Sequence, residues 1–265
     1  MISLIELLKE AVSKPKAIIL AGAPGAGKGY ILRGLDLAGL KVLNVDDIYV
    51  PLLQKANVTL DLKNATPEER SEQAKQMAAA NKQFKGDVEA TIEGKESFIL
   101  DGTGASYNST AKLKNELEEA GYKVFMLYVY TDLQRSLSQN QDRYEKSEGK
   151  DRSLAPAIVM RTWKSVTDNL PKYAELFGNN FVAVANTLDD RMQDIDKIIK
   201  KYLTPFDPQG TKPKTPKEQA KSDARKAKDK EEIQIMLSDD FIYDVIEYTM
   251  SKEEAQMRIE KFLNS

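Results

Sequence analysis

The sequence contains neither cysteine nor histidine, and each absence narrows the chemistry open to this chain of 265 residues. Without cysteine there is no disulfide framework and no thiolate nucleophile, and we expect a cytoplasmic protein. Without histidine the chain lacks the most common base near neutral pH and the most common zinc ligand. Acid–base chemistry therefore falls to carboxylates, lysine or tyrosine.

Long apolar runs and a strong positive charge are also missing. No apolar stretch approaches the roughly 20 residues of a membrane-spanning helix, so no membrane association is expected. Glu6 and Glu10 interrupt the apolar part of the opening sequence MISLIELLKEAVSKPK, which argues against a secretory signal. We expect an amphipathic helix there, with Ile5, Leu8 and Val12 on one stripe. The net charge of −2 provides no general attraction to nucleic acid.

Short apolar runs alternate with helical patterns along the chain. Strands are predicted at 17–21, 41–45, 97–100, 124–130 and 181–185. Helices are predicted from the end of a Gly-rich loop to about 38 and at roughly 109–120, 132–146, 156–176 and 188–203. This alternation favours an α/β fold with three layers, in which helices cover both faces of a mostly parallel, five-stranded sheet.

Three stretches stand apart from this alternation. Residues 57–96 carry no strand pattern, and Pro67 followed by two glutamates favours the start of a polar helix, so we expect a helical insertion in a main domain spanning 1–203. The Pro- and Lys-rich stretch 204–231 indicates an extended or partly helical linker. Amphipathic order returns at 232–265, a small helical segment that docks on the main domain, self-associates or binds a partner.

The strongest motif is GAPGAGKG, which has the GxxxxGK spacing of a phosphate-binding loop and lies between a predicted strand and a predicted helix. Glycines let backbone amides surround an anion, and Lys28 then reaches the β- and γ-phosphates. ATP or GTP is expected to contact Gly22, Ala23, Pro24, Gly25, Ala26, Gly27, Lys28, Gly29 and Tyr30. Because Gly29 replaces the usual Ser or Thr, carboxylates and water must hold Mg²⁺.

Asp46 and Asp47 follow the second predicted strand, at the end where ligands bind in an open α/β sheet. Phosphoryl transfer to a hydroxyl requires a carboxylate that orients the acceptor or takes its proton. We predict that Asp46 is this catalytic group and that Asp47 contacts the substrate. The alternative is that an aspartate, Asp47 in particular, caps a helix starting near Ile48.

Asp101 ends the third predicted strand in the sequence FILD, a pattern typical of a metal-binding carboxylate in phosphate-loop proteins. We predict that it holds Mg²⁺ directly or through water. The following glycines keep the backbone near the phosphates, and Thr103 is predicted to contact the substrate. The alternative for this stretch is an ordinary turn.

Four arginines surround a polar loop between two predicted helices: Arg135, Arg143, Arg152 and Arg161. We predict that Arg143 and Arg152 are catalytic and belong to a lid at about 143–155 that closes over the triphosphate. The alternative is a solvated helical face on which these arginines pair with nearby Asp and Glu. Trp163 and Tyr173 on the next helix are expected in the core rather than under a nucleobase.

Four motifs together resemble the zeta-toxin-like and polynucleotide-kinase-like branch of P-loop kinases, including bacteriophage-encoded kinases of this type. They are GAPGAGKG, NVDD, FILDGTG and QDRYEKSEGKDRSLAPAIV, and the resemblance covers roughly 16–203. It implies that Lys28 grips phosphate, Asp46 activates the acceptor hydroxyl and Asp101 serves metal or substrate, with Arg143 and Arg152 in the lid. Where family members often place an arginine after the aspartates, this chain has Ile48, Tyr49 and Val50.

Two functions fit these motifs. The first is a kinase that moves the γ-phosphate of ATP to a hydroxyl of a nucleoside, nucleotide, sugar nucleotide or nucleic-acid end. The second is a nucleotide-binding interaction or assembly protein with little turnover, which Gly29, Tyr30 and the tethered segment 232–265 favour. Under the second, removing that segment would abolish partner binding and leave ATP affinity intact.

Overall fold

The computed structural model describes residues 14–35, 37, 39–62, 65–148, 151–187, 215–236, 238 and 245–265. The helices that we predict at the N-terminus and at 188–203 lie outside these residues. Among the described residues, no helix is both long enough and apolar enough to cross a membrane.

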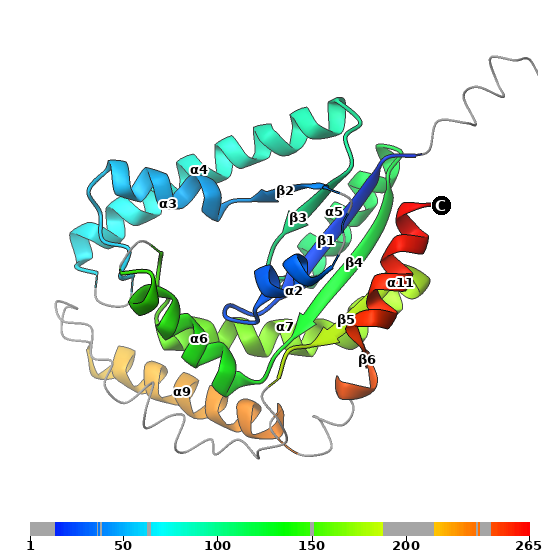
Figure 1. Cartoon of the computed structure of the whole chain (residues 1–265). Helices are drawn as coiled ribbons and strands as arrows, with labels where there is room; N and C mark the ends of the chain where they lie inside the picture. Colours follow the sequence, from blue (N-terminus) through cyan, green and yellow to red (C-terminus); the bar gives the residue numbers. More distant parts are fainter. Residues whose placement is uncertain are drawn as a thin grey trace, which may run out of the picture.

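A parallel sheet of six strands forms the centre of the structure (Figure 1). The strands are β1 (Lys16–Gly22), β2 (Lys41–Asn44), β3 (Phe98–Asp101), β4 (Lys123–Tyr130), β5 (Phe181–Ala185) and β6 (Thr249–Met250), arranged in the order β2-β3-β1-β4-β5-β6. We predicted five strands, so the expected number was wrong by one. The additional strand β6 contains two residues and has no apolar run that would reveal it.

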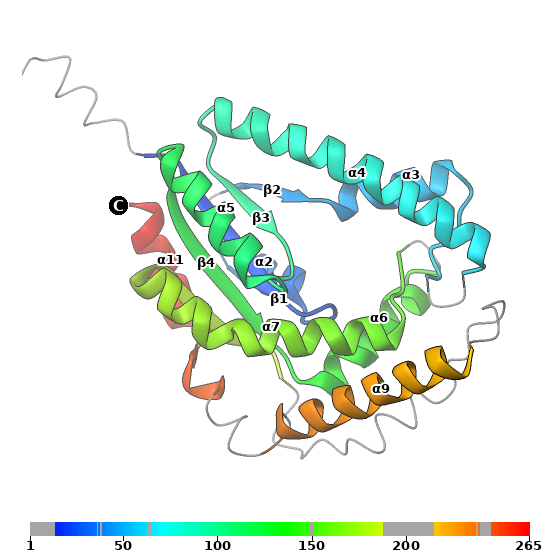
Figure 2. The same ribbon diagram turned by 180° about the vertical axis from the view of Figure 1, so that it is seen from behind.

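Helices cover both faces of the sheet, as expected for three layers. One face carries α2 (Lys28–Gly34) and α11 (Lys252–Leu263), and the opposite face carries α5 (Tyr107–Glu119) and α7 (Pro156–Phe177) (Figures 1 and 2). The remaining elements are α3 (Asp46–Lys55), α4 (Pro67–Glu93), α6 (Leu133–Lys146), the 3-10 turn Gly178–Asn180 and α9 (Pro216–Met236). Both Trp163 and Tyr173 on α7 are fully buried, as the core interpretation requires.

The helices α3 and α4 form an arm that projects from β2 (Figure 1). Thr66 caps α4 by accepting a hydrogen bond from the Glu69 amide, while the Glu69 carboxylate accepts one from the Thr66 amide. A small apolar core within the arm, centred on Tyr49 and Leu53, holds the two helices together. The arm therefore has packing of its own and ends next to the carboxyl edge of the sheet.

The C-terminal segment docks on the main domain by adding β6 to the sheet and laying α11 over it. Three side chains of α11 are buried in the main core, Ala255, Ile259 and Phe262, and the Phe262 ring lies 4.9 Å from that of Phe125 on β4. The helix α9 crosses position 231, where we divided linker from C-terminal segment, so that division stays a prediction.

The helix after the phosphate-binding loop is shorter than expected. We predicted that it runs to about 38, but α2 ends at Gly34. Leu35 takes an extended conformation and is buried in the core, as is Leu37. Glycine is a poor helix former, and burying these leucines requires the chain to leave the helix there.

Candidate active site

The loop between β1 and α2 has a backbone that only glycine fits at two positions. Gly25 and Gly27 have φ values of 74° and 77°, in the left-handed region. A Cβ atom on Gly25 would lie 2.3 Å from the Ser136 carbonyl oxygen, and one on Gly27 would lie 2.3 Å from Asn186 Nδ2. Gly25 and Gly27 are therefore required to be glycine for two reasons, the positive φ and the close neighbouring atoms.

Side chains distant in the sequence hold this loop in place. The Ser136 hydroxyl donates to the Pro24 carbonyl, and Asn186 Nδ2 donates to the Ala26 carbonyl at 2.7 Å. The side-chain amide of Gln139, oriented to satisfy its neighbours, donates to the Gly25 carbonyl at 2.8 Å. Sequence analysis missed all three residues. Asn186 alone had a recognisable signal, since it directly follows β5 at the ligand-binding edge.

We expect Gly25→Ala to destabilise the protein by about 1–3 kcal/mol, because the new methyl group meets backbone and φ is positive. The matched control is Gly86→Ala on α4, where a Cβ meets nothing within 4 Å and φ is not positive. That change is expected to stabilise by up to about 1 kcal/mol. Urea unfolding of both variants measures the difference, and equal values would show that the loop is not so constrained.

Lys28 and Asp101 face each other at the first turn of α2 and the end of β3. Lys28 Nζ lies 3.8 Å from Asp101 Oδ1 and donates to the Gly22 carbonyl at 3.3 Å. Burial lowers the pKa of the Lys28 ammonium, and the Asp101 carboxylate partly opposes this. Burial likewise raises the pKa of Asp101, and the Lys28 ammonium opposes it. The pair is thus a largely desolvated ammonium and carboxylate beside the loop.

Asp46 is bound by Arg152, although 106 residues separate them in the sequence. Arg152 Nη2 donates to both carboxylate oxygens of Asp46 at 2.7 Å. The Arg152 Nε atom is buried and has no hydrogen-bond partner among the described residues. A buried donor without a partner is costly, so the guanidinium retains unused capacity to bind an anion.

The loop that carries Arg152 is fastened to the arm. The Ser153 amide donates to the Leu60 carbonyl at 3.1 Å, and the Ser153 hydroxyl donates to Asp61 Oδ1 at 2.8 Å. On the other side, Asn140 of α6 exchanges two hydrogen bonds with the backbone of Leu154. The position of Arg152 therefore depends on both the arm and α6.

Arg143 lies at the edge of the site. It is about half exposed and pairs with Asp151, which agrees with the alternative of a solvated face for this residue. Its charge nevertheless acts on Lys28 and Asp101, whose pKa values it helps to lower. Arg152 differs, because its partner is Asp46 rather than a neighbouring acidic residue.

Asp47, Thr103 and Tyr30 lie around the site without entering its ion pairs. Asp47 is exposed in the first turn of α3, which starts at Asp46 with Val45 at the N-cap position. The alternative in which an aspartate caps a helix from Ile48 is therefore wrong. The Thr103 carbonyl accepts from the Gly22 amide, and its hydroxyl accepts from the Ala105 amide. The exposed Tyr30 ring lies 4.5 Å from Lys252 Nζ of α11.

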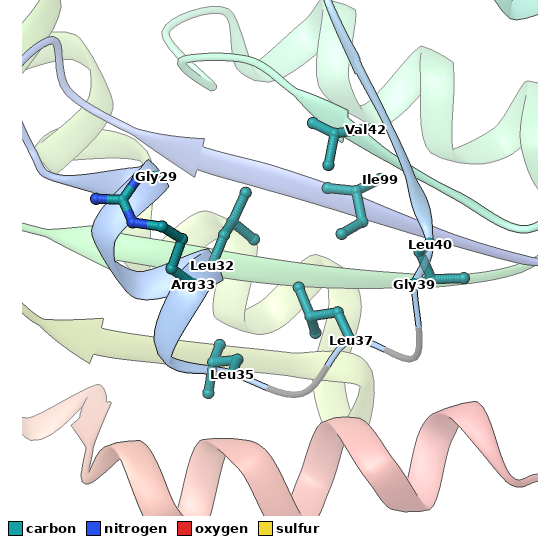
Figure 3. Close-up of a pocket in the computed structure, with 9 residues that line it drawn as sticks. All are labelled: Gly29, Leu32, Arg33, Leu35, Leu37, Gly39, Leu40, Val42 and Ile99. Carbon is teal, nitrogen blue, oxygen red and sulfur yellow. The ribbon is translucent and has the colours of Figure 1, made fainter.

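An apolar cavity of about 490 Å³ lies beside α2 (Figure 3). None of the charged residues described above is part of its lining. Its lining residues are Gly29, Leu32, Arg33, Leu35, Leu37, Gly39, Leu40, Val42 and Ile99. Arg33 is the one ionisable residue in this set, and no carboxylate of the described residues is part of the lining. The described charged groups that phosphoryl transfer needs lie elsewhere, at the carboxyl ends of β1, β2 and β3.

Residues 4–199, well over half of the chain, match the family model described as Zeta toxin. The chain belongs to the Zeta toxin family. Membership makes it a P-loop kinase with an unspecified phosphate acceptor. No curated protein matches the sequence.

Solved structures resemble the fold at low sequence identity. One, of AvrRxo1-ORF1 with AvrRxo1-ORF2 and sulphate ions, is 16% identical with a TM-score of 0.50, covering 98% of this chain and 80% of that chain. The same complex with ATP is 16% identical with a TM-score of 0.48, and the match covers 95% of this chain and 81% of that chain. A structure from the PezAT toxin–antitoxin system of Streptococcus pneumoniae is 17% identical with a TM-score of 0.45, and the match covers 88% of this chain and 93% of that chain. The first of these reaches a TM-score of 0.50, and at 16% identity its likeness shows the fold alone.

Tyr49 lies on α3, three residues after Asp46. It is buried, with its hydroxyl 3.4 Å from the Gln73 carbonyl and its ring centroid 5.9 Å from the Arg152 guanidinium carbon. A cation near an aromatic ring is attracted by its quadrupole. Tyr49 therefore supports Arg152 from within the arm.

Proposed function

We propose that this kinase uses ATP and transfers its γ-phosphate to a hydroxyl of a nucleoside, nucleotide, sugar nucleotide or nucleic-acid end. The observation that carries the proposal is the gathering of Lys28, Asp46 and Asp101 at the carboxyl ends of three neighbouring strands, with Arg152 bound to Asp46. In this proposal Lys28 is the cation, Asp46 the base and Arg152 the anion-binding group around one glycine-rich loop, as phosphoryl transfer requires.

Each group has a defined role in the proposed reaction. The acceptor hydroxyl donates its proton to Asp46, and its oxygen bonds to the γ-phosphorus. The bond from that phosphorus to the β,γ-bridging oxygen breaks, and ADP leaves with the electron pair. Lys28 offsets negative charge on the phosphates, while the backbone amides of the loop hold them.

Arg152 connects phosphate binding to the base. Its Nη2 atom holds both oxygens of Asp46, and its Nε atom has no partner. A γ-phosphate offers several acceptor oxygens, and guanidinium groups bind phosphate in a planar, two-point manner. We propose that Arg152 turns toward the phosphate and leaves Asp46 to the acceptor hydroxyl. Arg143 has the role of a second lid arginine in this proposal.

The donor set fits Mg²⁺ as an ion that keeps most of its water. Within the described residues, no cluster of three or more Asp, Glu, His or Cys could hold a metal alone. Asp101 presents Oδ1 toward the loop, and Mg²⁺ is commonly bound by one or two carboxylates together with phosphates and water. Asp101 would hold the ion, which would neutralise charge on the β- and γ-oxygens.

Transfer of label from [γ-³²P]ATP to a panel of acceptors tests the proposed function. The panel comprises nucleosides, nucleotides, sugar nucleotides and oligonucleotides with free hydroxyl ends, and water is scored as released phosphate. We expect one acceptor class to be labelled well above the others. Absence of both transfer and hydrolysis by folded protein that binds ATP would overturn the proposal.

We expect Asp46→Asn to reduce turnover by about 10²–10⁴-fold, because an amide cannot accept the acceptor's proton. The amide oxygen still accepts from Arg152, so ATP affinity by calorimetry is expected to change by less than about threefold. The matched control is Asp87→Asn, the same change at an exposed position of α4, for which we expect a small effect on turnover. Equal losses in both variants would show that Asp46 is not the base.

The proposal also covers the cellular location of the kinase, its origin and a binding partner. We place the kinase in the cytoplasm and retain the bacteriophage origin that the sequence resemblance implies. Besides nucleotide and acceptor, a protein partner or a second copy of the chain is proposed to bind through 232–265. Exposed apolar side chains in that range support this proposal, namely Ile235, Ile246, Tyr248 and Met257.

A further inference from the structure

Asn44, the last residue of β2, contacts both aspartates of the proposed site, Asp101 at its carboxylate and Asp46 at its backbone amide. Its Oδ1 atom accepts a hydrogen bond from the Asp46 amide at 2.9 Å. Its Nδ2 atom donates to Asp101 Oδ2 at 3.0 Å. The orientation of the amide follows from these partners, because a backbone N–H can only donate and an ionised carboxylate can only accept.

The parallel register brings Asn44 beside Asp101. The two residues are direct neighbours where β2 pairs with β3, so the side chain reaches across one strand spacing. Asp101 is consequently held on both sides, with Oδ2 on Asn44 and Oδ1 facing Lys28. On the other side, the bond to the Asp46 amide fixes the start of α3, which has no side-chain cap at Val45.

We infer that Asn44 is a positioning residue that sets the distance and direction between the carboxylates of Asp46 and Asp101. The inference rests on the proposed function, in which those carboxylates serve the acceptor and the nucleotide. Without Asn44, Asp101 loses a hydrogen-bond donor and is free to swing away from Lys28, while Asp46 begins a less constrained helix. A misplacement of about 1 Å in such a group is enough to slow phosphoryl transfer.

Two substitutions separate the two hydrogen bonds. Asn44→Asp keeps an acceptor for the Asp46 amide but replaces the donor to Asp101 with a second carboxylate. Asn44→Ala removes both bonds. The control is Asn108→Asp, the same change at an exposed position of α5. Turnover is measured with labelled ATP and the acceptor identified by the panel, or with water as acceptor, and ATP affinity is measured by calorimetry.

Both Asn44 variants are expected to lose about 10- to 100-fold in kcat, the usual effect of removing a residue that orients a site ligand. The KM for ATP is expected to change by less than about threefold, because the phosphate-binding loop and Lys28 are intact. Asn108→Asp is expected to behave as the wild type. Wild-type kcat in the Asn44 variants, or an equal loss in kcat and ATP affinity, would overturn the inference.

A double substitution distinguishes positioning from a general structural role. In an Asp101→Asn background, Asn44→Asp restores a hydrogen bond between the two positions with donor and acceptor exchanged. The second change is then expected to cost less than about threefold in residual kcat, since there is no Asp101 carboxylate left to position. A further loss equal to that in the wild-type background would show a merely structural role. Inactive wild-type protein would instead refute the proposed function. Thermal unfolding of the wild type, Asn44→Asp, Asp101→Asn and the double variant would still report whether the hydrogen bond between positions 44 and 101 exists.

Discussion

Replacing Lys28 with methionine is expected to lower the rate of phosphoryl transfer by about three orders of magnitude or more. Lys28 Nζ lies beside the glycine-rich loop and faces Asp101 in a largely desolvated setting, with each side chain 16% exposed. A charge in such a setting acts more strongly on phosphate than one in water, because little solvent screens it. Methionine retains much of the buried chain and removes only the ammonium group.

The same substitution also leaves Asp101 without its cation. Burial already raises the pKa of Asp101, and Lys28 provides the largest opposing influence. Without it the pKa of Asp101 rises further, and the carboxylate gains protons at a higher pH than in the wild type. A pH profile of any residual activity in Lys28→Met is therefore expected to show its acidic limb displaced to higher pH.

Single-turnover assays with labelled ATP measure this effect. The control is Lys221→Met, on the exposed surface of α9 and far from the loop in sequence, for which we expect an unchanged rate. Calorimetry on both variants separates loss of ATP binding from loss of transfer. Similar modest effects from the two substitutions would show that Lys28 is not the phosphate-binding lysine.

Much of the fold could be predicted because buried parallel strands leave continuous apolar runs in the sequence. The segments AIILA, VFMLYVY and FVAVA are of this kind, and all lie within central strands β1, β4 and β5. By contrast, β6 has two residues at the edge of the sheet, and its pairing depends on where α11 packs. The early end of α2 likewise depends on burial of Leu35 and Leu37, which tertiary packing decides.

The candidate site was predictable where strand ends mark it. Asp46 and Asp101 stand directly after apolar runs, and the carboxyl ends of parallel strands meet at one edge. Their partners could not be predicted, because Arg152 lies 106 residues from Asp46 and Asn44 lies 57 residues from Asp101. Such contacts depend on strand order and on the loop between α6 and α7, neither of which composition or periodicity determines.

Loss of α11 is expected to prevent folding rather than to release a docking device. The structure departs here from the assembly hypothesis, under which removing the C-terminal segment leaves ATP affinity intact. Ala255 and Ile259 are fully buried and Phe262 nearly so, in the same apolar cluster as Ile18 and Phe125 of the central strands. A chain truncated after 250 would expose that cluster to water.

Point substitutions on α11 measure how much its buried side chains contribute to the free energy of unfolding. Ile259→Ala is expected to lower the free energy of unfolding by about 2–5 kcal/mol and Phe262→Ala by about 3–5 kcal/mol. Met257→Ala, on the same helix but 62% exposed, is expected to change it by less than about 0.5 kcal/mol. Urea unfolding followed by the fluorescence of the single, buried Trp163 reports all three.

The sum of these losses approaches the whole stability of a typical domain, about 5–15 kcal/mol. Truncation after 250 should therefore yield insoluble or unfolded protein without ATP binding. If the truncated chain instead stays folded and binds ATP like the wild type, α11 does not belong to the core and the assembly hypothesis regains its support. If it unfolds, its loss of activity says nothing about a partner, and partner binding must be tested with exposed positions such as Met257.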